Sequence, residues 1–399
     1  MQSRFGSHFD GLPGEDKETD IIRFAKQKLL NSGKDHLEAG DSSGSLACLA
    51  IRFGLEFNED EDSCDISFKQ VECHMRICIA ATTGFKKLIT CSSSEPLLAE
   101  AAFDLMSHTT SSPVKHLANH VNLYCVDRGR RGELVAALII MQARDAALPE
   151  QVRQRRWVSV THFIQALLPP QKSKEFLDSH PTHWREEEGD ITFRQMFDNC
   201  RMWFNHIIKV EDGDVIKPDF LWKFVTRGAM VVCKDNQQGI DIILPVVWME
   251  GELSRRTISS IVIQVKNSKE FGLNIKNKLF DAMDPCGLGL LANQPRPTIR
   301  MVFALASPKA GIRFPSRRTR VMRAENFTSY DIWCAGMSTE TFRQIGEDVD
   351  SYQKLLDRSQ RSHDAFDVSE SPNPLSENTK IIVGRTRRSM APLVKYEVS

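Results

Sequence analysis

The sequence lacks the features of secreted and membrane-spanning proteins. Its ten cysteines include no C-x-x-C pair, and several lie within apolar runs, where free buried thiols are common. The N-terminus carries no signal peptide, and no apolar run approaches the roughly 20 residues needed to cross a bilayer. We therefore expect a soluble intracellular protein of the nucleus or cytoplasm, with neither a disulfide framework nor a membrane partner.

Net charge and two familiar catalytic motifs are also missing. Lys plus Arg and Asp plus Glu both number 52, so the chain as a whole does not attract nucleic acid, and such binding would depend on local basic patches. The chain contains no phosphate-binding P-loop and no H-E-x-x-H zinc motif. These absences argue against P-loop nucleotide hydrolases and zincin-type metalloproteases.

Composition along the 399 residues divides the chain into three parts. We expect a mostly helical region over 1–120, with helices over 66–82 and 95–107, because apolar residues recur there at helical spacing. A mixed α/β domain should follow over 121–356, with a helical insertion at about 146–225. From residue 357 the chain is polar and rich in Pro, Ser and Asn, which is typical of a disordered tail.

The mixed domain is predicted from a change of periodicity. Residues 134–141 are apolar nearly all round and predict a buried helix, with Glu133 at its favourable N-terminal end. Short apolar runs then predict five strands, over 229–233, 240–247, 258–266, 299–305 and 331–335. A helix over 268–283 is expected between the third and fourth of these strands. Pro245 predicts that the second strand ends, bends or lies at a sheet edge there. The fold class is therefore α/β, with a mixed sheet core flanked by helices.

Two of these strands carry the residues that point most directly to chemistry. Side chains alternate along a strand, so Gln264 and Lys266 point to one face, about 7 Å apart. Asp241 lies at the start of the preceding strand. Alternatively, Asp241 only satisfies a turn at the entry of that strand.

A hard cation could bind this set of residues. Mg²⁺ or Mn²⁺ prefers oxygen ligands, which the Asp241 carboxylate, the Gln264 amide and the Val265 carbonyl can supply. Lys266 could stabilise a phosphate or position an attacking water. Glu133 would add a second carboxylate if its helix packs under this edge of the sheet.

This order of elements and residues resembles the PD-(D/E)XK nuclease superfamily, whose fold is restriction-endonuclease-like. The resemblance covers roughly residues 130–310. The helix at Glu133 looks like the first-helix Glu of the family, and Gly-x-Asp at 239–241 looks like its motif Asp. Gln264-Val265-Lys266 looks like the variant found in Mrr-like enzymes, in which Gln replaces the acid. The resemblance implies a metal-dependent phosphodiesterase, although Gln264 leaves the site one carboxylate short.

Longer phrases of the sequence resemble a family of uncharacterised basidiomycete fungal proteins, some of which have a Crinkler-effector-like architecture. The phrases are RGRRGELVAALIIMQARD, LWKFVTRGAMVV, GIDIILPV and SIVIQVKN. This second resemblance implies no settled function.

Clustered arginines are the candidate contacts to nucleic acid, with DNA favoured. They fall in two groups, one before the Glu133 helix and one after the predicted sheet: Arg128, Arg130 and Arg131, and Arg317, Arg318 and Arg320. An exposed charged loop would explain the first group equally well. Two hypotheses follow: a Mg²⁺-dependent nuclease that uses Asp241, Gln264, Lys266 and Glu133, or a nuclease-fold module without catalysis that binds nucleic acid or a protein partner.

Overall fold

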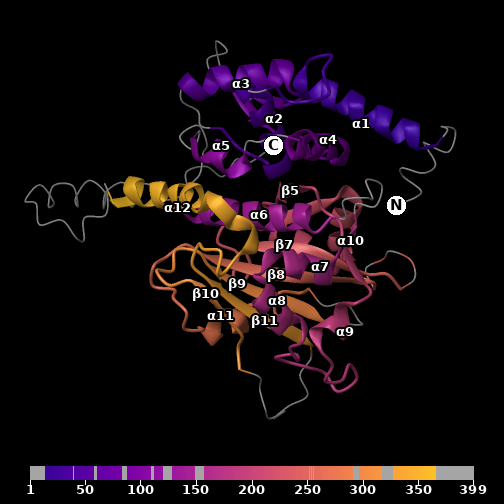
Figure 1. Cartoon of the computed structure of the whole chain (residues 1–399), viewed down its shortest axis with the longest axis vertical. Helices are drawn as coiled ribbons and strands as arrows, with labels where there is room; N and C mark the ends of the chain where they lie inside the picture. Colours follow the sequence, from indigo (N-terminus) through magenta and orange to yellow (C-terminus); the bar gives the residue numbers. More distant parts are fainter. Residues whose placement is uncertain are drawn as a thin grey trace, which may run out of the picture. The chain divides into compact units, whose positions relative to one another are not determined.

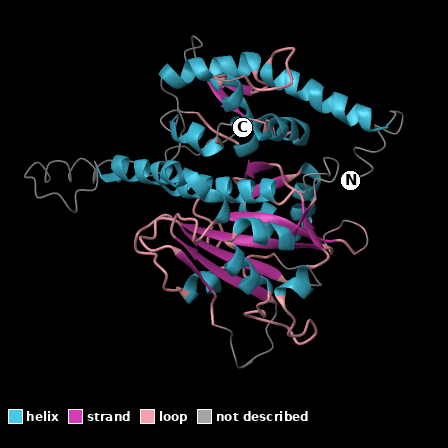
Figure 2. Ribbon diagram, viewed as in Figure 1, coloured by secondary structure: helices cyan, strands magenta, loops and turns pink. Residues whose placement is uncertain are grey.

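The computed structural model describes residues 14–364, except 39, 58–60, 83–87, 109–111, 120–127, 149–156, 251, 253, 255, 291–295 and 317–326. The chain divides into two compact units, Met1–Leu356 and Asp357–Ser399. The second unit covers the same residues as the tail predicted to be disordered, and all of it beyond Asp364 lies outside the described residues. The first unit is of the mixed α/β class, as predicted (Figures 1 and 2).

Among the described residues, five helices and a small hairpin precede the long helix α6 (Arg128–Ala146), which itself precedes the main sheet. The helices are α1 (Gly14–Leu30), α2 (Ser42–Phe53), α3 (Glu61–Cys73), α4 (Pro96–Ser107) and α5 (Pro113–Asn119). The predicted helix over 66–82 is wrong beyond Cys73. Met75 adopts a left-handed φ of 59°, and the chain then forms β1 (Ile77–Ala81), which pairs with β2 (Leu88–Cys91). Its β-branched isoleucines favour a strand over a continued helix.

The large sheet has nine strands among the described residues. The order is β10-β11-β9-β8-β7, after which β7 pairs with both β4 and β6; β4 then leads to β3 and β6 to β5. The bounds are β3 (Val158–Ser159), β4 (Cys200–Met202), β5 (His206–Lys209), β6 (Ala229–Val232), β7 (Ile242–Trp248), β8 (Ile258–Lys266), β9 (Thr298–Ala304), β10 (Gly311–Arg313) and β11 (Ser329–Ala335). Strands β6, β7 and β8 form an antiparallel meander, whereas β8, β9 and β11 are parallel.

Each face of this sheet buries its own apolar core. On one face, Ile242, Ile261 and Ile263 pack with α6 (Arg128–Ala146), α7 (Val160–Leu167), α8 (Pro170–Leu177) and α9 (Phe193–Phe197). On the other face, Ile243 and Val262 pack with α10 (Pro218–Arg227) and α11 (Asn277–Ala282). Residues 135–141 of α6 are buried on every side, as their all-round apolar pattern predicts.

Several predicted details were wrong. The insertion at 146–225 carries the strands β3, β4 and β5 as well as helices and the 3-10 turn η4 (Gly213–Ile216). The helix expected over 268–283 is only α11. After β11 the chain forms a 3-10 turn, η5 (Arg343–Asp348), and then α12 (Val349–Asp364). Strand β7 continues through Pro245, because β6 pairs only with Ile242 and Ile243, and β4 only with Val247 and Trp248. Pro245, which has no N–H to donate, therefore lies between the part of β7 that pairs with β6 and the part that pairs with β4.

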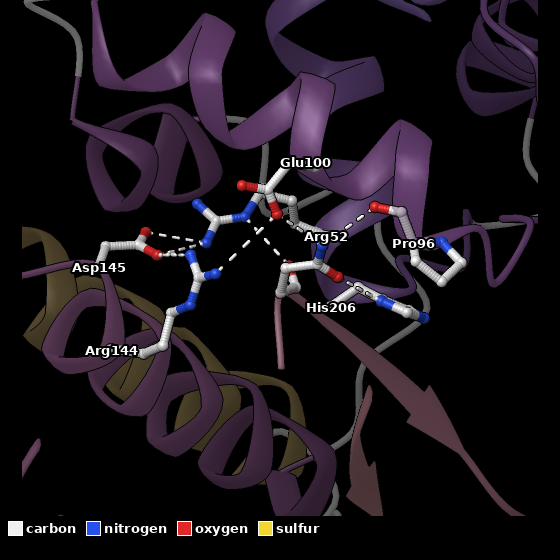
Figure 3. Close-up of polar contacts among 7 residues, drawn as sticks. Arg52, Pro96, Glu100, Arg144, Asp145 and His206 are labelled. Atoms are coloured by element: carbon white, nitrogen blue, oxygen red, sulfur yellow. Dashed lines mark hydrogen bonds and ion pairs between the residues drawn. The ribbon is translucent and has the colours of Figure 1, made fainter. Parts of the chain in front are cut away.

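A buried polar network joins the N-terminal helices to α6 and β5 (Figure 3). Arg52 at the end of α2 donates to both carboxylate oxygens of Asp145 at 2.8 Å, and Arg144 donates to the same carboxylate at 2.9 Å. Asn205 donates to Glu100 of α4 at 2.9 Å. Because two guanidinium groups and two carboxylates compensate one another, their burial is tolerated and fixes α2 and α4 on the sheet domain.

His206 extends this network and has both ring nitrogens engaged. Its Nδ1 lies 2.8 Å from Asn205 Oδ1, which only accepts, so this nitrogen carries the proton. Its Nε2 lies 2.9 Å from the Ser94 hydroxyl and must therefore accept from it. The imidazole is thus neutral. Burial, together with the nearby charge of Arg227, lowers the pKa of His206 to about 4.

We expect the protein to lose about 3 kcal/mol of stability between pH 6.5 and pH 4 through His206 alone. The folded pKa lies below the ordinary value of 6.5, so the unfolded chain binds more protons in this window and acid favours unfolding. Urea unfolding at several pH values should show this slope of the free energy of unfolding against pH. His206→Gln should remove it, whereas His36→Gln, on an exposed side chain, should keep it. An unchanged slope in His206→Gln would contradict the assignment.

Candidate functional site

The candidate residues meet where β6 ends, β7 begins and β8 ends. Cys233 N–H donates to the Asp241 carbonyl at 2.8 Å, and Asp241 N–H donates to the Ile263 carbonyl at 3.0 Å. The paired register begins with Ile242 and Ile263, so Asp241 and Gln264 lie just beyond the last pair between β7 and β8. Cys233, Asp241 and Gln264 therefore form one row at the same end of three neighbouring strands. Cys233 and, by alternation with Val262, Gln264 point to the face that carries α10 and α11.

The turn before Asp241 requires a glycine. Gly239 has a left-handed φ of 79°, and a Cβ added there would lie 2.0 Å from the Ala282 carbonyl oxygen. The close approach to the end of α11 leaves no room for a side chain. The Gly-x-Asp spacing therefore has a structural cause, because this turn delivers Asp241 to the row.

The Asp241 carboxylate lies across the end of β8. Its Oδ2 accepts from the Val265 N–H at 2.6 Å, which is the one side-chain hydrogen bond of Asp241 among the described residues. Burial raises the pKa of Asp241, while the Val265 N–H and the charge of Lys266 act in the opposite direction and do not fully compensate. The N–H and C=O of a strand residue point to the same side, so the Val265 carbonyl also faces the Asp241 edge.

Gln264 carries an amide oxygen without a hydrogen-bond partner. Its side chain is only 6% exposed, and Oε1 is buried with no donor among the described residues. A buried carbonyl oxygen left unpaired costs about 1–3 kcal/mol, so such a group is rare unless a water or a ligand satisfies it. Lys266, two residues further on and half-buried, points to the same face and makes no ion pair within the described part of the chain.

Glu133 approaches the same end of the sheet from the opposite face. A Cβ added to Gly132 would lie 3.3 Å from Val265 Cγ1 and 3.1 Å from Asn267 Cβ, so the start of α6 packs directly against the end of β8. Both Asp241 and Glu133 raise the pKa of the buried Cys233 thiol, after the larger effect of burial. The two carboxylates thus lie within electrostatic range of one thiol, although no contact joins them directly.

The predicted arginine contacts are only partly described. Arg128 and Arg130 lie in the first turn of α6, and Arg131 follows them as a partly buried residue with an interaction partner of its own. These three residues belong to a helix, so the exposed-loop interpretation of this group is wrong. Arg317, Arg318 and Arg320 lie outside the described residues.

A second charged cluster lies in the core near the opposite end of the sheet, and no motif of the sequence indicated it. Arg300 on β9 donates to both carboxylate oxygens of Asp331 on β11, at 2.8 and 2.5 Å, and also to the Phe280 carbonyl at 2.8 Å. His183 Nδ1 lies 3.0 Å from the same guanidinium. Burial alone would raise the pKa of Asp331, but Arg300 and His183 outweigh it and hold the pKa at about 2. Arg300 lies within an apolar strand, so periodicity did not reveal its partner.

The oxygens at the Asp241 end of the sheet fit a hard divalent cation. Within the described ranges no group of three His, Cys, Asp or Glu side chains could hold a metal. The set here is different, because it combines one carboxylate with the unpartnered Gln264 amide oxygen and the Val265 carbonyl. Mg²⁺ accepts such a set, since it keeps several of its own waters. Glu133 is the one further carboxylate that α6 brings near.

Comparison with known families identifies the chain as a member of one of them. A model described as a domain of unknown function (DUF8736) matches residues 36–282, and the chain belongs to that family. The match includes the helices α2 to α5 as well as Glu133, Asp241, Gln264 and Lys266. No curated protein and no solved structure matches the chain. Among the described residues no helix is both long enough and apolar enough to span a membrane.

Proposed function

We propose that the protein is a metal-dependent phosphodiesterase of the PD-(D/E)XK type, in its Gln-x-Lys variant, that acts on DNA or RNA. The observation that carries the proposal is the buried, unpartnered Oε1 of Gln264, in one row with the Asp241 carboxylate. The element order supports it as well. A buried helix, an antiparallel three-stranded meander, a helix and a parallel strand occur in this order as α6, β6–β8, α11 and β9, with the insertion between α6 and β6.

Each residue has a defined role in this proposal. Asp241, Gln264 and the Val265 carbonyl would hold Mg²⁺ or Mn²⁺, with Glu133 as a further carboxylate. The bound cation would supply Lewis-acid stabilisation of phosphate charge and a more acidic water. Lys266 places an ammonium beside the carboxylate, where it can hold the scissile phosphate and orient the attacking water. Because the pKa of Asp241 is raised, protonation of this carboxyl competes with cation binding as pH falls.

A second candidate function rests on Gln264 itself. A neutral amide in place of an acid lowers the charge available to bind a cation, and the whole chain has no net charge. The protein would then be a nuclease-fold module that binds nucleic acid or a protein partner without cutting. Binding of DNA that weakens steeply with salt, without nicking, would favour this function.

The experiment that tests the first function is nicking of supercoiled DNA and cleavage of a structured RNA by the purified protein. We expect cleavage in Mg²⁺ or Mn²⁺ and none in EDTA. Gln264→Glu should strengthen Mn²⁺ binding by about tenfold, because it supplies the missing carboxylate to a hard cation. Gln264→Leu should abolish that binding. Calorimetry with Mn²⁺ measures both, and equal affinities in the two variants would contradict the proposed ligand set.

A further inference from the structure

The end of the sheet that holds Lys266 extends away from Asp241 as far as β10. Lys266 pairs with Ala304 of β9, and Ala304 pairs with Ala335 of β11. Ala335 in turn pairs with Gly311, the first residue of β10. Three strand spacings of about 4.8 Å separate Lys266 from Gly311, so this edge extends about 14 Å beyond the proposed site.

Five lysines border this edge and keep their charge available. The segments that leave it, residues 266–278 and 305–310, contain a single acidic residue, Glu270. Their basic residues, here called the lysine rim, are Lys266, Lys269, Lys276, Lys278 and Lys309. None of the five makes an ion pair with another residue that the structure describes. Lys276 Nζ lies 4.0 Å from the centre of the Phe271 ring, a contact that leaves its positive charge uncompensated.

The first of these segments lies on the α11 face of the sheet, to which Lys266 also points. The Trp333 indole N–H, on this face of β11, donates to the Gly272 carbonyl at 2.9 Å. A Cβ added to Gly311 of β10 would lie 3.3 Å from the Leu273 side chain. The middle of the segment is therefore held against β11 and β10. Lys309 precedes Gly311 by two residues, so it borders the same edge.

The charge balance is reversed on the other side of Asp241, beyond β5 and β6. Residues 209–217 and 233–238 contain three lysines and four acids, which are Glu211, Asp212, Asp214 and Asp235. Two of these lysines are ion-paired, Lys209 with Asp235 at 3.1 Å and Lys217 with Asp214 at 2.8 Å. The end of α11 adds a further acid, Asp281, on this side, because it packs on Gly239 in the turn between β6 and β7. A polyanion is therefore attracted to the lysine rim and repelled by these segments.

We infer that the phosphate backbone of the nucleic acid runs from the Asp241 site over the lysine rim toward β10, and not over the acidic segments beyond β5 and β6. The inference rests on the proposed function, which places a phosphate beside Lys266. One strand of a DNA duplex carries a phosphate about every 3.4 Å along the helix axis, so an edge of about 14 Å accommodates about four phosphates beyond that one. The rim has four lysines beyond Lys266, which matches the charge that they would neutralise.

The salt dependence of binding tests this inference. Fluorescence anisotropy is measured at several KCl concentrations with a labelled DNA duplex or RNA hairpin, whichever binds more tightly, in Ca²⁺ to limit cleavage. Lys269→Met and Lys309→Met should each reduce the slope of log K against log salt by about 1, and weaken binding about fivefold to tenfold at about 0.1 M KCl, because each loses one phosphate contact. Lys269→Arg keeps the charge and should keep the slope. Lys234→Met, on an exposed lysine at the same sheet end beyond β6, is the matched control and should also keep it.

The outcomes separate this inference from the proposed function. Reduced slopes in Lys269→Met and Lys309→Met, in a protein that never cleaves, uphold the path over the lysine rim and overturn the nuclease. Metal-dependent cleavage with unchanged slopes in both variants overturns the path alone. A reduced slope in Lys234→Met, with none in the rim variants, places the backbone on the opposite side and also overturns the path. Absence of both binding at low salt and cleavage overturns the path and the nuclease together.

Discussion

Asp241→Asn is expected to lower the rate of metal-dependent DNA nicking by about a thousandfold, a loss of about 4 kcal/mol of transition-state stabilisation. The substitution removes the one carboxylate of the row but keeps an oxygen that can accept from the Val265 N–H. Asp198→Asn, on an exposed aspartate of the same unit, is the control and should keep full activity. Equal nicking by wild type and Asp241→Asn would show contamination and overturn the assignment.

The same substitution should not reduce stability, which distinguishes a binding site from a structural one. Burial raises the pKa of Asp241, so the folded protein binds this proton more tightly than the unfolded chain does. The stability that this tighter proton binding contributes is therefore fully present below the ordinary pKa of 3.8. It is lost as pH rises through the pKa that Asp241 has in the folded protein. At pH 7 we expect urea unfolding of metal-free Asp241→Asn to give a free energy equal to or above that of wild type. A drop of several kcal/mol would indicate a structural aspartate instead.

Lys266→Ala completes this test because it separates binding from chemistry. The variant keeps all the proposed oxygen ligands, so Mn²⁺ affinity should change little, while nicking falls by about a hundredfold or more through the lost ammonium. Lys174→Ala is the matched control. A large loss of Mn²⁺ affinity in Lys266→Ala would show that the lysine supports the fold of the site rather than the reaction.

Arg300→Met is expected to destabilise the protein by about 3–5 kcal/mol, because it leaves the carboxylate of Asp331 buried without its cation. Both side chains are at most 1% exposed, and the guanidinium makes two hydrogen bonds to this carboxylate. Arg194→Met provides the contrast, since the Arg194–Asp178 pair is exposed and should contribute less than about 1 kcal/mol. Urea unfolding at pH 7 measures both variants.

The Arg300–Asp331 pair also predicts a response to acid. The pKa of Asp331 falls from 3.8 to about 2 on folding, so its contribution is present above pH 3.8 and is lost as pH falls through 2. The loss amounts to about 2 kcal/mol. Replacing both partners, as Arg300→Met with Asp331→Leu, should recover much of the stability and remove the loss of stability in acid. A loss below about 1 kcal/mol in Arg300→Met alone would contradict this account.

The central strands were predictable because their signal is local. Strands β7, β8 and β9 each contain a run of at least three apolar residues, as buried strands do, and their bounds fell within two residues of the predicted ones. Strands β3, β4 and β5 were missed, because runs of two to four residues carry no periodicity. They are strands only through distant partners, such as the pairing of Cys200 with Trp248.

The sequence by itself determined which residues are candidates for the site and that Gln264 and Lys266 share one face of a strand. Alternation fixes Gln264 and Lys266 on one side of a strand in any fold that contains it, and Gly239 with Asp241 marks a tight entry to the strand before it. Only the tertiary structure decided what these residues meet. Strand pairing brought the Asp241 carboxylate to the Val265 N–H beside Gln264, packing of Gly132 on Val265 brought Glu133 to the same sheet end, and burial left the Gln264 amide oxygen without a partner. Pairing and burial depend on residues far apart in the chain, which local pattern does not record.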